Sequence, residues 1–493
     1  MKPRLLALAL LTLVMSLLAP AAASASSSQL SLFQDDRELL NGVGADRASV
    51  MERLDELGVD ILRTNVIYGR VYKTPSDLKK PSNFKTEDPD NRHYDWSATD
   101  GLIDLAQAKG IKVQLTITGP GPRFSSDNPK KCKSGQPCTY KPNTKEFGKF
   151  AAAAAKHFKG KASYYSIWNE PNIGKTWLQP RYERRKGVGT VDYAAAKYRQ
   201  LYMAGRNAIA KYDPAHKNKV LFGEVPSIAA PLPFLRATLC LDSRGNPFRG
   251  KLAKAQGCSG RVSKISTLGF AIHPYNQGAL YGPTQRYKTK TSLTQAHLPR
   301  LHRLLDGAFK RKRISSGARA VYITEFGYQT RPPDKSPGAA SLAKQAEYIN
   351  ESDRLFFGDP RVKWVSQYEF TDVPEADQFN TGLRLFSGKL KPSYEAYRMP
   401  IVVTRRSANS VEVYGQIRPG GSSSIAIQAQ ASGGSFTTVK TVRSNRRGVI
   451  RLNVHKKKAF RLRWRLSAIS PVTNRAITSR AAVAGMKLRY YKD

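Results

Sequence analysis

Two glutamates, Glu170 and Glu325, each stand where a run of β-favouring residues ends. Glu170 lies in "YYSIWNEPN", where Pro171 cannot donate to a β-ladder and so ends the strand, and Glu325 ends the run "AVYITEFG". Two converging carboxylates are what glycoside hydrolysis needs, because one protonates the leaving oxygen while the other attacks or activates water. A separation of about 5 to 5.5 Å favours direct attack and retention, and a larger gap admits water. The sequence leaves that separation open.

Other polar residues also lie at the ends of predicted strands. They are Arg63, Asn65, Asn169, His273, Tyr275, Gln367, Tyr368 and Glu369. Taken singly, a strand-end glutamate is more often a buried partner of an arginine than a catalyst. His273 and Tyr275 are explained equally well by packing. The prediction of catalysis therefore depends on the pair of glutamates in its motif context.

The elements that must position these residues repeat one pattern from about residue 29 to residue 400. An amphipathic helical stretch is followed by a Gly, Asn or Asp stop and a short apolar strand, as in "DRASVMERLDELGVDILRTNV". Strands are expected near residues 30, 61, 113, 163, 219, 267, 320 and 363. Eight such units predict an α/β fold, a closed (β/α)8 TIM barrel, with reactive groups at the C-terminal ends of its strands. An open doubly wound sheet is the alternative, but the GxGxxG turn after its first strand is missing.

The pattern changes at Ile401, where short alternating strands are separated by Gly- and Ser-rich turns. We expect residues 401–493 to form a small all-β sandwich domain. This segment carries 19 Lys and Arg against two acidic residues, with clusters at 456–458 and at Arg461, Arg463 and Arg465. The functional interpretation is an anchor onto an anionic cell-wall polymer; the alternative is a solvated basic face.

The first residues, 1–25, have the pattern of a signal peptide. Lys2 and Arg4 precede an apolar run, and small residues with Ala-x-Ala sites follow. A membrane anchor is the alternative, but the run is short and no second span of about 20 apolar residues follows. We therefore expect a secreted, extracellular protein, in the cell wall if the basic domain anchors it, with no transmembrane segment after cleavage.

The four cysteines agree with export. Cys132 and Cys138 bracket a short segment, and Cys240 and Cys258 bracket another. Two local disulfides are the natural pairing, although four cysteines allow three connectivities. A zinc site is the alternative, but CxxC and a nearby His pair are both missing.

The formal net charge of +44 fits nucleic acid, anionic lipid or anionic polysaccharide as a partner. A nucleic-acid fold signature is missing, which disfavours nucleic acid. The sequence has no HxH, HExxH or paired Asp cluster, no GxSxG and no Walker pattern. We therefore expect no metal and no other cofactor.

The motifs "WNEPN" at 168–172, "HPY" at 273–275 and "TEFG" at 324–327 together resemble the clan A glycoside hydrolases, retaining (β/α)8 enzymes that include families 5 and 39. The resemblance spans nearly the whole barrel, including Arg63 and the closing "TGLRLFSGKLKPSYEAYR". It implies a retaining hydrolase that cleaves O-glycosidic bonds in a polysaccharide or glycoconjugate.

The resemblance also implies roles for single residues. Glu170 would be the acid/base and Glu325 the nucleophile, while Asn169 would hydrogen-bond the sugar 2-hydroxyl. Arg63 would lie under Glu325 and keep it ionised. Tyr275 would hydrogen-bond the nucleophile, and His273 would support the same wall.

Aromatic residues are candidates for stacking on sugar rings. Trp177, in the loop after the fourth strand, is the best placed of them. Many clan A barrels end the eighth strand with a tryptophan under the sugar, whereas this chain reads "WVSQYEFTD". Tyr368 or Phe370 would take that place, or Glu369 would contact a hydroxyl. Loops at about 69–95, 119–145 and 231–262 are expected to shape the cleft.

Two rival functions use the same sequence features. A carbohydrate-binding or cell-surface scaffold would keep the barrel without catalysis, although binding alone does not need both an acid and a nucleophile. A transglycosylase would share every site residue and differ only in whether sugar or water intercepts the intermediate.

Overall fold

The computed structural model of this chain describes residues 29–42, 46–276, 282–287 and 289–491. The predicted signal peptide, residues 1–25, lies outside them. Within the described ranges, no helix has the length and apolarity that crossing a membrane requires.

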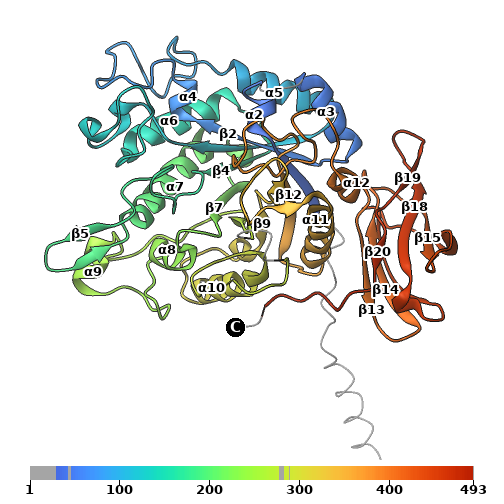
Figure 1. Ribbon diagram of the computed structural model, residues 1–493. Helices are drawn as coiled ribbons and strands as arrows, with labels where there is room; N and C mark the ends of the chain where they lie inside the picture. Colours follow the sequence, from blue (N-terminus) through green and yellow to red (C-terminus); the bar gives the residue numbers. More distant parts are fainter. Residues whose placement is uncertain (1–28, 43–45, 277–281, 288, 492–493) are drawn as a thin grey trace, which may run out of the picture.

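Eight parallel strands close into a barrel, which confirms the predicted fold class (Figure 1). Their order around the barrel is β1-β12-β9-β8-β7-β4-β3-β2, and β1 closes it by pairing with both β12 and β2. The strands are β1 (Leu30–Gln34), β2 (Ile61–Ile67), β3 (Lys112–Thr118), β4 (Tyr164–Ile167), β7 (Val220–Pro226), β8 (Phe270–His273), β9 (Val321–Ile323) and β12 (Val362–Tyr368). Every residue of β2 and of β7 is buried, as expected for strands covered on both faces.

Helices surround the barrel and precede or follow its strands. In chain order they are α2 (Asp36–Leu39), α3 (Arg47–Glu56), α4 (Tyr68–Val71), α5 (Ser97–Ala108), α6 (Thr144–His157), α7 (Tyr193–Tyr212), α8 (Pro231–Thr238), α9 (Gly250–Ala255), α10 (Leu298–Lys310), α11 (Leu342–Phe357) and α12 (Pro392–Arg398). Local chemistry sets their ends: Asp46 accepts from two backbone N–H groups at the start of α3, and Gly58 follows that helix with φ +66°.

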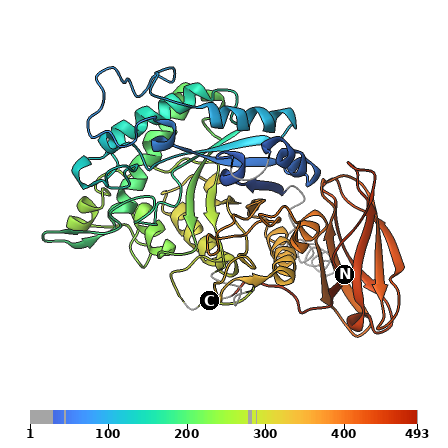
Figure 2. The ribbon, with the colours of Figure 1, turned by 45° about the horizontal axis from the view of Figure 1, so that its top comes forward.

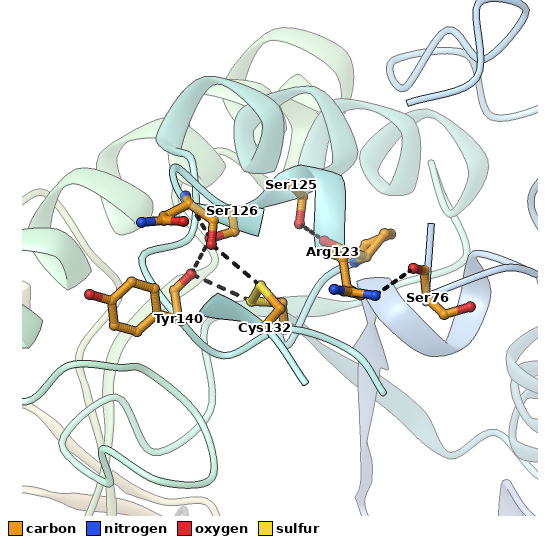
Figure 3. The surroundings of a disulfide bond; sticks show 9 residues. Ser76, Arg123, Ser125, Ser126, Cys132 and Tyr140 are labelled. Carbon is orange, nitrogen blue, oxygen red and sulfur yellow. Dashed lines mark hydrogen bonds between the residues drawn. A yellow bond between two sulfur atoms is a disulfide. The ribbon is translucent and has the colours of Figure 1, made fainter. Parts of the chain in front are cut away.

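The connecting segments carry two disulfides, Cys132–Cys138 and Cys240–Cys258, as the cysteine spacing predicts. The first lies in the loop after β3, where the Ser126 hydroxyl donates to the Tyr140 carbonyl at 2.5 Å (Figure 3). The second joins the end of α8 to the end of α9. The segment 231–262 therefore contains two helices, of 8 and 6 residues, and the prediction of one uninterrupted loop there is wrong. Short strand pairs lie elsewhere: β5 (Glu183–Arg185) with β6 (Gly189–Val191), and β10 (Thr330–Arg331) with β11 (Ala340–Ser341).

The C-terminal part is an all-β sandwich, as predicted. One sheet has the order β13-β14-β17, and the other has β16-β15-β18-β19 with β20 paired to β18. The strands are β13 (Ile401–Arg405), β14 (Ser410–Gln416), β15 (Ser424–Gln430), β16 (Thr437–Arg443), β17 (Val449–His455), β18 (Arg463–Ile469), β19 (Ala476–Thr478) and β20 (Ala482–Val483). Their inner faces bury one apolar core around Trp464. Arg461 lies in a 3-10 turn before β18, so only Arg463 and Arg465 of that cluster share a strand face.

The sandwich lies beside α11 and α12 of the barrel, and the second view shows the same arrangement (Figure 1, Figure 2). Arg418 pairs with Asp353 at 2.9 Å, and Arg354 pairs with Glu412 at 2.9 Å across this contact. Phe357 and Tyr414 pack in the same place with ring centroids 5.2 Å apart. Because α12 ends at Arg398 and β13 begins at Ile401, we propose a domain division at residue 400, as the sequence predicts.

Candidate active site

A strained turn at the end of β4 presents Glu170. Trp168 and Glu170 both have positive φ values, +67° and +42°, a conformation that costs an L-residue about 1 to 2 kcal/mol. Packing and hydrogen bonds hold the turn. Trp168 is 1% exposed, and its ring packs against that of Phe147 with the ring centroids 5.2 Å apart. The Glu170 N–H donates to the Glu224 carbonyl at 3.0 Å. The strain is therefore located where the chain turns into the candidate site.

The barrel brings the two sequence-predicted glutamates together. One carboxylate oxygen of Glu170, one of Glu325 and a ring nitrogen of His273 all lie within 4.8 Å of one another. His273 Nδ1 is 3.0 Å from Glu170 Oε1 and 3.4 Å from Glu325 Oε2. Glu325 is largely buried, and the Glu170 side chain is more exposed, at 16%. The residues thus form one compact acidic cluster around one imidazole.

Arg63, on β2, lies at the base of this cluster. It is 1% exposed, and its Nη1 donates to Glu325 Oε1 at 2.5 Å and to Gln34 Oε1. Its Nη2 donates to Asn169 Oδ1 at 2.7 Å and lies 3.2 Å from Glu224 Oε2. Burial acts to lower the pKa of Arg63, but Glu224 and Glu325 raise it above its ordinary value. The guanidinium is therefore a permanent cation that orients an amide and two carboxylates.

Asn169 is oriented by two contacts. Its backbone N–H donates to Thr118 Oγ1 at 3.0 Å, and its side-chain oxygen accepts from Arg63. Because an arginine is always a donor, this contact assigns the oxygen to the Arg63 side and the amide nitrogen to the other. Asn169 lines the cleft described below, so its NH₂ group can donate to a ligand there.

Three aromatic residues predicted for the site also lie in it. The Tyr275 hydroxyl donates to Glu325 Oε2 at 3.2 Å, and burial raises its pKa well above the usual value, so the phenol keeps its proton. Trp177 Nε1 donates to Glu170 Oε2 at 3.2 Å, a contact that sequence reasoning did not foresee. Tyr368 lines the cleft at the end of β12. Trp177 and Tyr368 together give the cleft two aromatic surfaces.

Glu224, on β7, was missed by the sequence reasoning. This fully buried carboxylate lies 2.8 Å from His273 Nε2 and accepts from Gln114 Nε2 at 3.0 Å and from Thr324 Oγ1 at 2.5 Å. Its φ of +49° coincides with a register shift between β7 and β8. The available signal was the Gly-Glu pair inside the apolar strand "VLFGEVP", where a charge must have partners.

Burial and mutual charge set the protonation of the cluster. Burial acts to raise the pKa of Glu224, but Arg63 and His273 outweigh it and lower this pKa to about 2. Burial acts to lower the pKa of His273, but Glu325, Glu170 and Glu224 outweigh it and raise this pKa to about 9. At neutral pH, Glu224 is thus ionised and His273 is a cation that donates from both nitrogens.

The pKa of Glu325 differs from the expectation that Arg63 keeps this residue ionised by lowering its pKa. Arg63 and His273 do act in that direction, but burial acts more strongly and raises the pKa of Glu325 above its ordinary value. The nearby Glu170 and Glu224 act in the same direction as burial. Ionisation of Glu325 therefore requires a higher pH than an exposed glutamate needs.

Glu170, His273 and Glu325 are also close enough to hold a metal ion. Hydrogen bonds already account for the arrangement of this group, since His273 Nδ1 lies 3.0 Å from Glu170 Oε1 and Nε2 lies 2.8 Å from Glu224 Oε2.

The cluster opens into a cleft of about 700 Å³. Its walls come from the C-terminal ends of the strands and from the segments that follow them, including Arg37, Asn65, Ile173, Ser227, Asn276 and Phe379. Of the three loops expected to shape it, only 69–95 contributes, through Arg70. Among the described residues, 119–145 and 231–262 contribute none, so that expectation is wrong for both. These two segments lie outside the cleft.

The structure also decides between the candidates at the end of the eighth strand. Tyr368 lines the cleft, whereas Phe370 is fully buried and packs 6.3 Å from Phe33. Glu369 is also fully buried and pairs with Arg37 at 3.1 Å. The expectation that Glu369 contacts a sugar hydroxyl is therefore wrong, because its carboxylate is enclosed in the protein.

The raised pKa of His273 leads to a pH-dependent stability. The pKa of His273 is about 9 in the folded protein and about 6.5 in the unfolded chain. Protonation of His273 therefore stabilises the folded protein fully below pH 6.5, and this contribution is lost as the pH rises through 9. It amounts to about 3 kcal/mol. In thermal unfolding, the gap between wild type and His273→Gln should therefore be larger at pH 6 than at pH 10. Parallel pH profiles of the two proteins would contradict this assignment.

The fold is similar to solved glycosidase structures, while no family model and no curated protein matches the sequence. A glucosidase from Croceicoccus marinus is 11% identical over 87% of this chain and 94% of its own, with a TM-score of 0.50. β-Glucuronidase 2 from Bacteroides uniformis is 9% identical over 93% of this chain and 46% of its own, with a TM-score of 0.42. The virulence factor SghA from Agrobacterium tumefaciens is 16% identical over 71% of this chain and 84% of its own, with a TM-score of 0.41. At such low identity, the likeness to the glucosidase shows the fold alone.

Proposed function

We propose that this protein is a retaining glycoside hydrolase that cleaves O-glycosidic bonds of a polysaccharide or glycoconjugate. Glu325 is the nucleophile and Glu170 the acid/base. The observation that carries this proposal is the approach of two carboxylates to within 4.8 Å at the base of an open cleft. A separation this short favours direct attack on the sugar over a water held between the two groups.

The reaction would proceed in two displacements. Glu325 attacks the anomeric carbon while Glu170 gives its proton to the leaving oxygen, so the glycosidic bond breaks and a glycosyl ester forms. Glu170 then takes a proton from water, which attacks the same carbon and releases Glu325. The Tyr275 hydroxyl and Arg63 orient the attacking carboxylate, and the Trp177 N–H orients the acid.

The charges of the cluster suit this exchange of roles. Arg63 and His273 are cations, and Glu170, Glu224 and Glu325 are carboxyl groups, so the cluster is neutral when one carboxyl holds a proton. Formation of the ester removes the negative charge of Glu325. By then Glu170 has given its proton to the leaving oxygen, so its carboxylate can take a proton from water and act as the base.

Asn169 is proposed to hold the sugar 2-hydroxyl through its amide nitrogen. Asn169→Ala should lower kcat/KM by roughly a hundredfold, because this hydrogen bond strengthens in the transition state. On the matching 2-deoxy glycoside, which lacks the hydroxyl, the same substitution should have little effect. Equal losses on both substrates would assign Asn169 only to the support of Arg63.

The rival scaffold function is disfavoured by the cost of the cluster. Burying Arg63, Glu224 and His273 together is expensive even when they are paired, and binding alone does not require it. A transglycosylase shares every residue named here. Product analysis with an added acceptor sugar separates hydrolysis from transfer.

The setting of the enzyme is proposed to be extracellular. The two disulfides fit an exported chain, as does the pattern of residues 1–25. We further propose that the basic sandwich contributes affinity for an anionic polymer. Because Arg418 and Arg354 pair across the contact with the barrel, removing residues 401–493 would leave Asp353 without its partner. Charge-neutralising substitutions are therefore the better test of that role.

The experiment that tests the activity is a screen of wild type beside Glu325→Gln on a panel of polysaccharides and aryl glycosides. Sugar released by wild type alone would support the proposal and name the substrate class. If wild type releases none, and the variant binds one polymer as tightly as wild type, the scaffold function is favoured.

A further inference from the structure

A second cavity, of about 630 Å³, lies on the barrel wall between α8 and α10. Seven of its lining residues are arginine or lysine, and none of those described is acidic. None of its lining residues lines the catalytic cleft. We call it the basic cavity.

The basic cavity is assembled from five separate segments, four of which supply its cations and the fifth Tyr491. Helix α10 places Arg300 and Arg303 on one face, because they are three residues apart, and Arg311 follows directly after the helix. Arg236 comes from α8, whereas Arg286 and Lys290 come from the segment after β8. Arg244 lies in a turn closed by the bridge between Leu241 and Pro247, next to the Cys240–Cys258 disulfide. A positive lining drawn from so many segments does not reflect one basic stretch of sequence.

These segments are fixed to one another. Arg300 is 7% exposed, and its Nη1 donates to the carbonyls of Thr289 and Ser292, each at 3.2 Å. These two hydrogen bonds fix the segment 289–292, which includes Lys290. The Tyr491 N–H donates to the Ala296 carbonyl at 2.9 Å, and the guanidinium of Arg286 lies 5.2 Å from the Tyr491 ring. The cavity is therefore preformed, and a ligand would not have to order it.

The acidic residues of these segments are engaged elsewhere. Asp306 pairs with Arg361 and lies 3.6 Å from Arg319, and neither arginine lines the cavity. Asp242 accepts the backbone N–H groups of Arg244 and Asn246. Arg236, Arg244, Arg286, Lys290 and Arg311 bring like charges into one cavity, where they repel, and a bound anion relieves that repulsion. Six of the seven cations are arginine, whose planar fork suits carboxylate, sulfate or phosphate groups.

The basic cavity adjoins the catalytic cleft through the segment after β7. Ser227 lines the cleft, and its carbonyl accepts from Ser292 Oγ at 2.8 Å. Leu232 lines the basic cavity, and its N–H donates to the Thr291 carbonyl at 3.2 Å. Leu241 and Leu304 add apolar side chains to the lining of the basic cavity, and these suit the apolar face of a sugar ring. The stretch 227–232 thus connects the walls of the two cavities.

We infer that the basic cavity binds an acidic segment of a carbohydrate chain, one that carries anionic groups such as carboxylates or sulfates on its sugar units. That the ligand is anionic follows from the lining. That it is a carbohydrate rests on the proposed function.

The test compares two triple variants of equal charge. One is Arg236→Gln, Arg244→Gln and Lys290→Gln in the basic cavity; its matched control is Lys85→Gln, Lys159→Gln and Lys217→Gln, three exposed lysines of the barrel that line neither cavity. The probe is a fluorescently labelled oligogalacturonate, and both variants are made in the Glu325→Gln background so that turnover cannot consume it. The cavity variant should bind roughly tenfold more weakly than its background, the control should not, and added salt should weaken binding throughout.

Three outcomes would overturn the inference. Equal losses in both variants would assign binding to net charge, and a loss only in the control would move the site to the outer surface of the barrel. Equal competition by a single-stranded DNA oligonucleotide of the same charge would contradict a carbohydrate ligand. Circular dichroism checks that each variant is folded. Activity on a neutral aryl glycoside should be unchanged by the cavity substitutions in the active chain, so a failure of the proposed catalysis is distinguished from a failure of anion binding.

Discussion

Glu325→Gln is expected to reduce turnover by roughly ten-thousand-fold or more, because an amide cannot form the glycosyl ester. Glutamine keeps the size of the side chain; its carbonyl oxygen can still accept from Arg63, and its amide nitrogen can donate to the Tyr275 oxygen. The fold and ligand binding should therefore stay near normal by circular dichroism and by binding of the identified substrate. The surface variant Glu347→Gln, whose native carboxylate pairs with Lys344 at 2.9 Å, is the matched control and should keep full activity.

A sharper measurement uses Glu325→Ala with added azide. The small anion can enter the space left by the carboxylate and attack the anomeric carbon in its place. The expected product is a glycosyl azide of inverted configuration, formed from an activated substrate. Turnover of Glu325→Ala at the wild-type rate without azide would remove Glu325 from the nucleophile role.

Glu170→Ala is expected to lower kcat/KM by roughly a thousandfold on substrates with poor leaving groups, because these need protonation of the departing oxygen. Activated aryl glycosides, whose leaving groups depart without a proton, should lose far less in the first step. Their second step lacks a base, so the glycosyl ester should accumulate. Burst kinetics and mass spectrometry of the intact protein measure that accumulation.

Azide again provides the control for Glu170→Ala. Here it should attack the ester from the face that Glu170 occupied, and the product should keep the configuration of the substrate. Equal losses on good and poor leaving groups would argue against the acid role. The two alanine variants with one reagent thus give opposite stereochemistry, which a purely structural role for either residue would not produce.

Much of the site was accessible from sequence because it depends on strand ends. A proline or a change to polar residues ends each strand locally. In a parallel barrel, the C-terminal ends of all strands lie at the same end of the barrel. Glu170, Glu325, Arg63, Asn169, His273 and Tyr275 were found in this way. Both disulfides were found from spacing, since a short loop keeps its cysteines close.

Glu224 escaped the sequence reasoning because its setting is not local. It lies at a register shift in β7, and its partners Arg63, His273, Gln114 and Thr324 come from four other strands. The same is true of Glu369, whose position next to Tyr368 suggested the cleft but whose carboxylate is enclosed beside Arg37. The alternation of side chains along β12 did not determine which way the Glu369 side chain points.

The sequence by itself determined the order of elements, the strand ends that carry the site and the pairing of nearby cysteines, because each is set by residues close together in the chain. Only the tertiary structure decided how near Glu170 lies to Glu325, which way the pKa of Glu325 moves and where the cations of the basic cavity gather. Each of these depends on burial and on charges that different strands and helices contribute. Because the closed barrel brings these elements together, none of them can be obtained from residues that are close together in the chain.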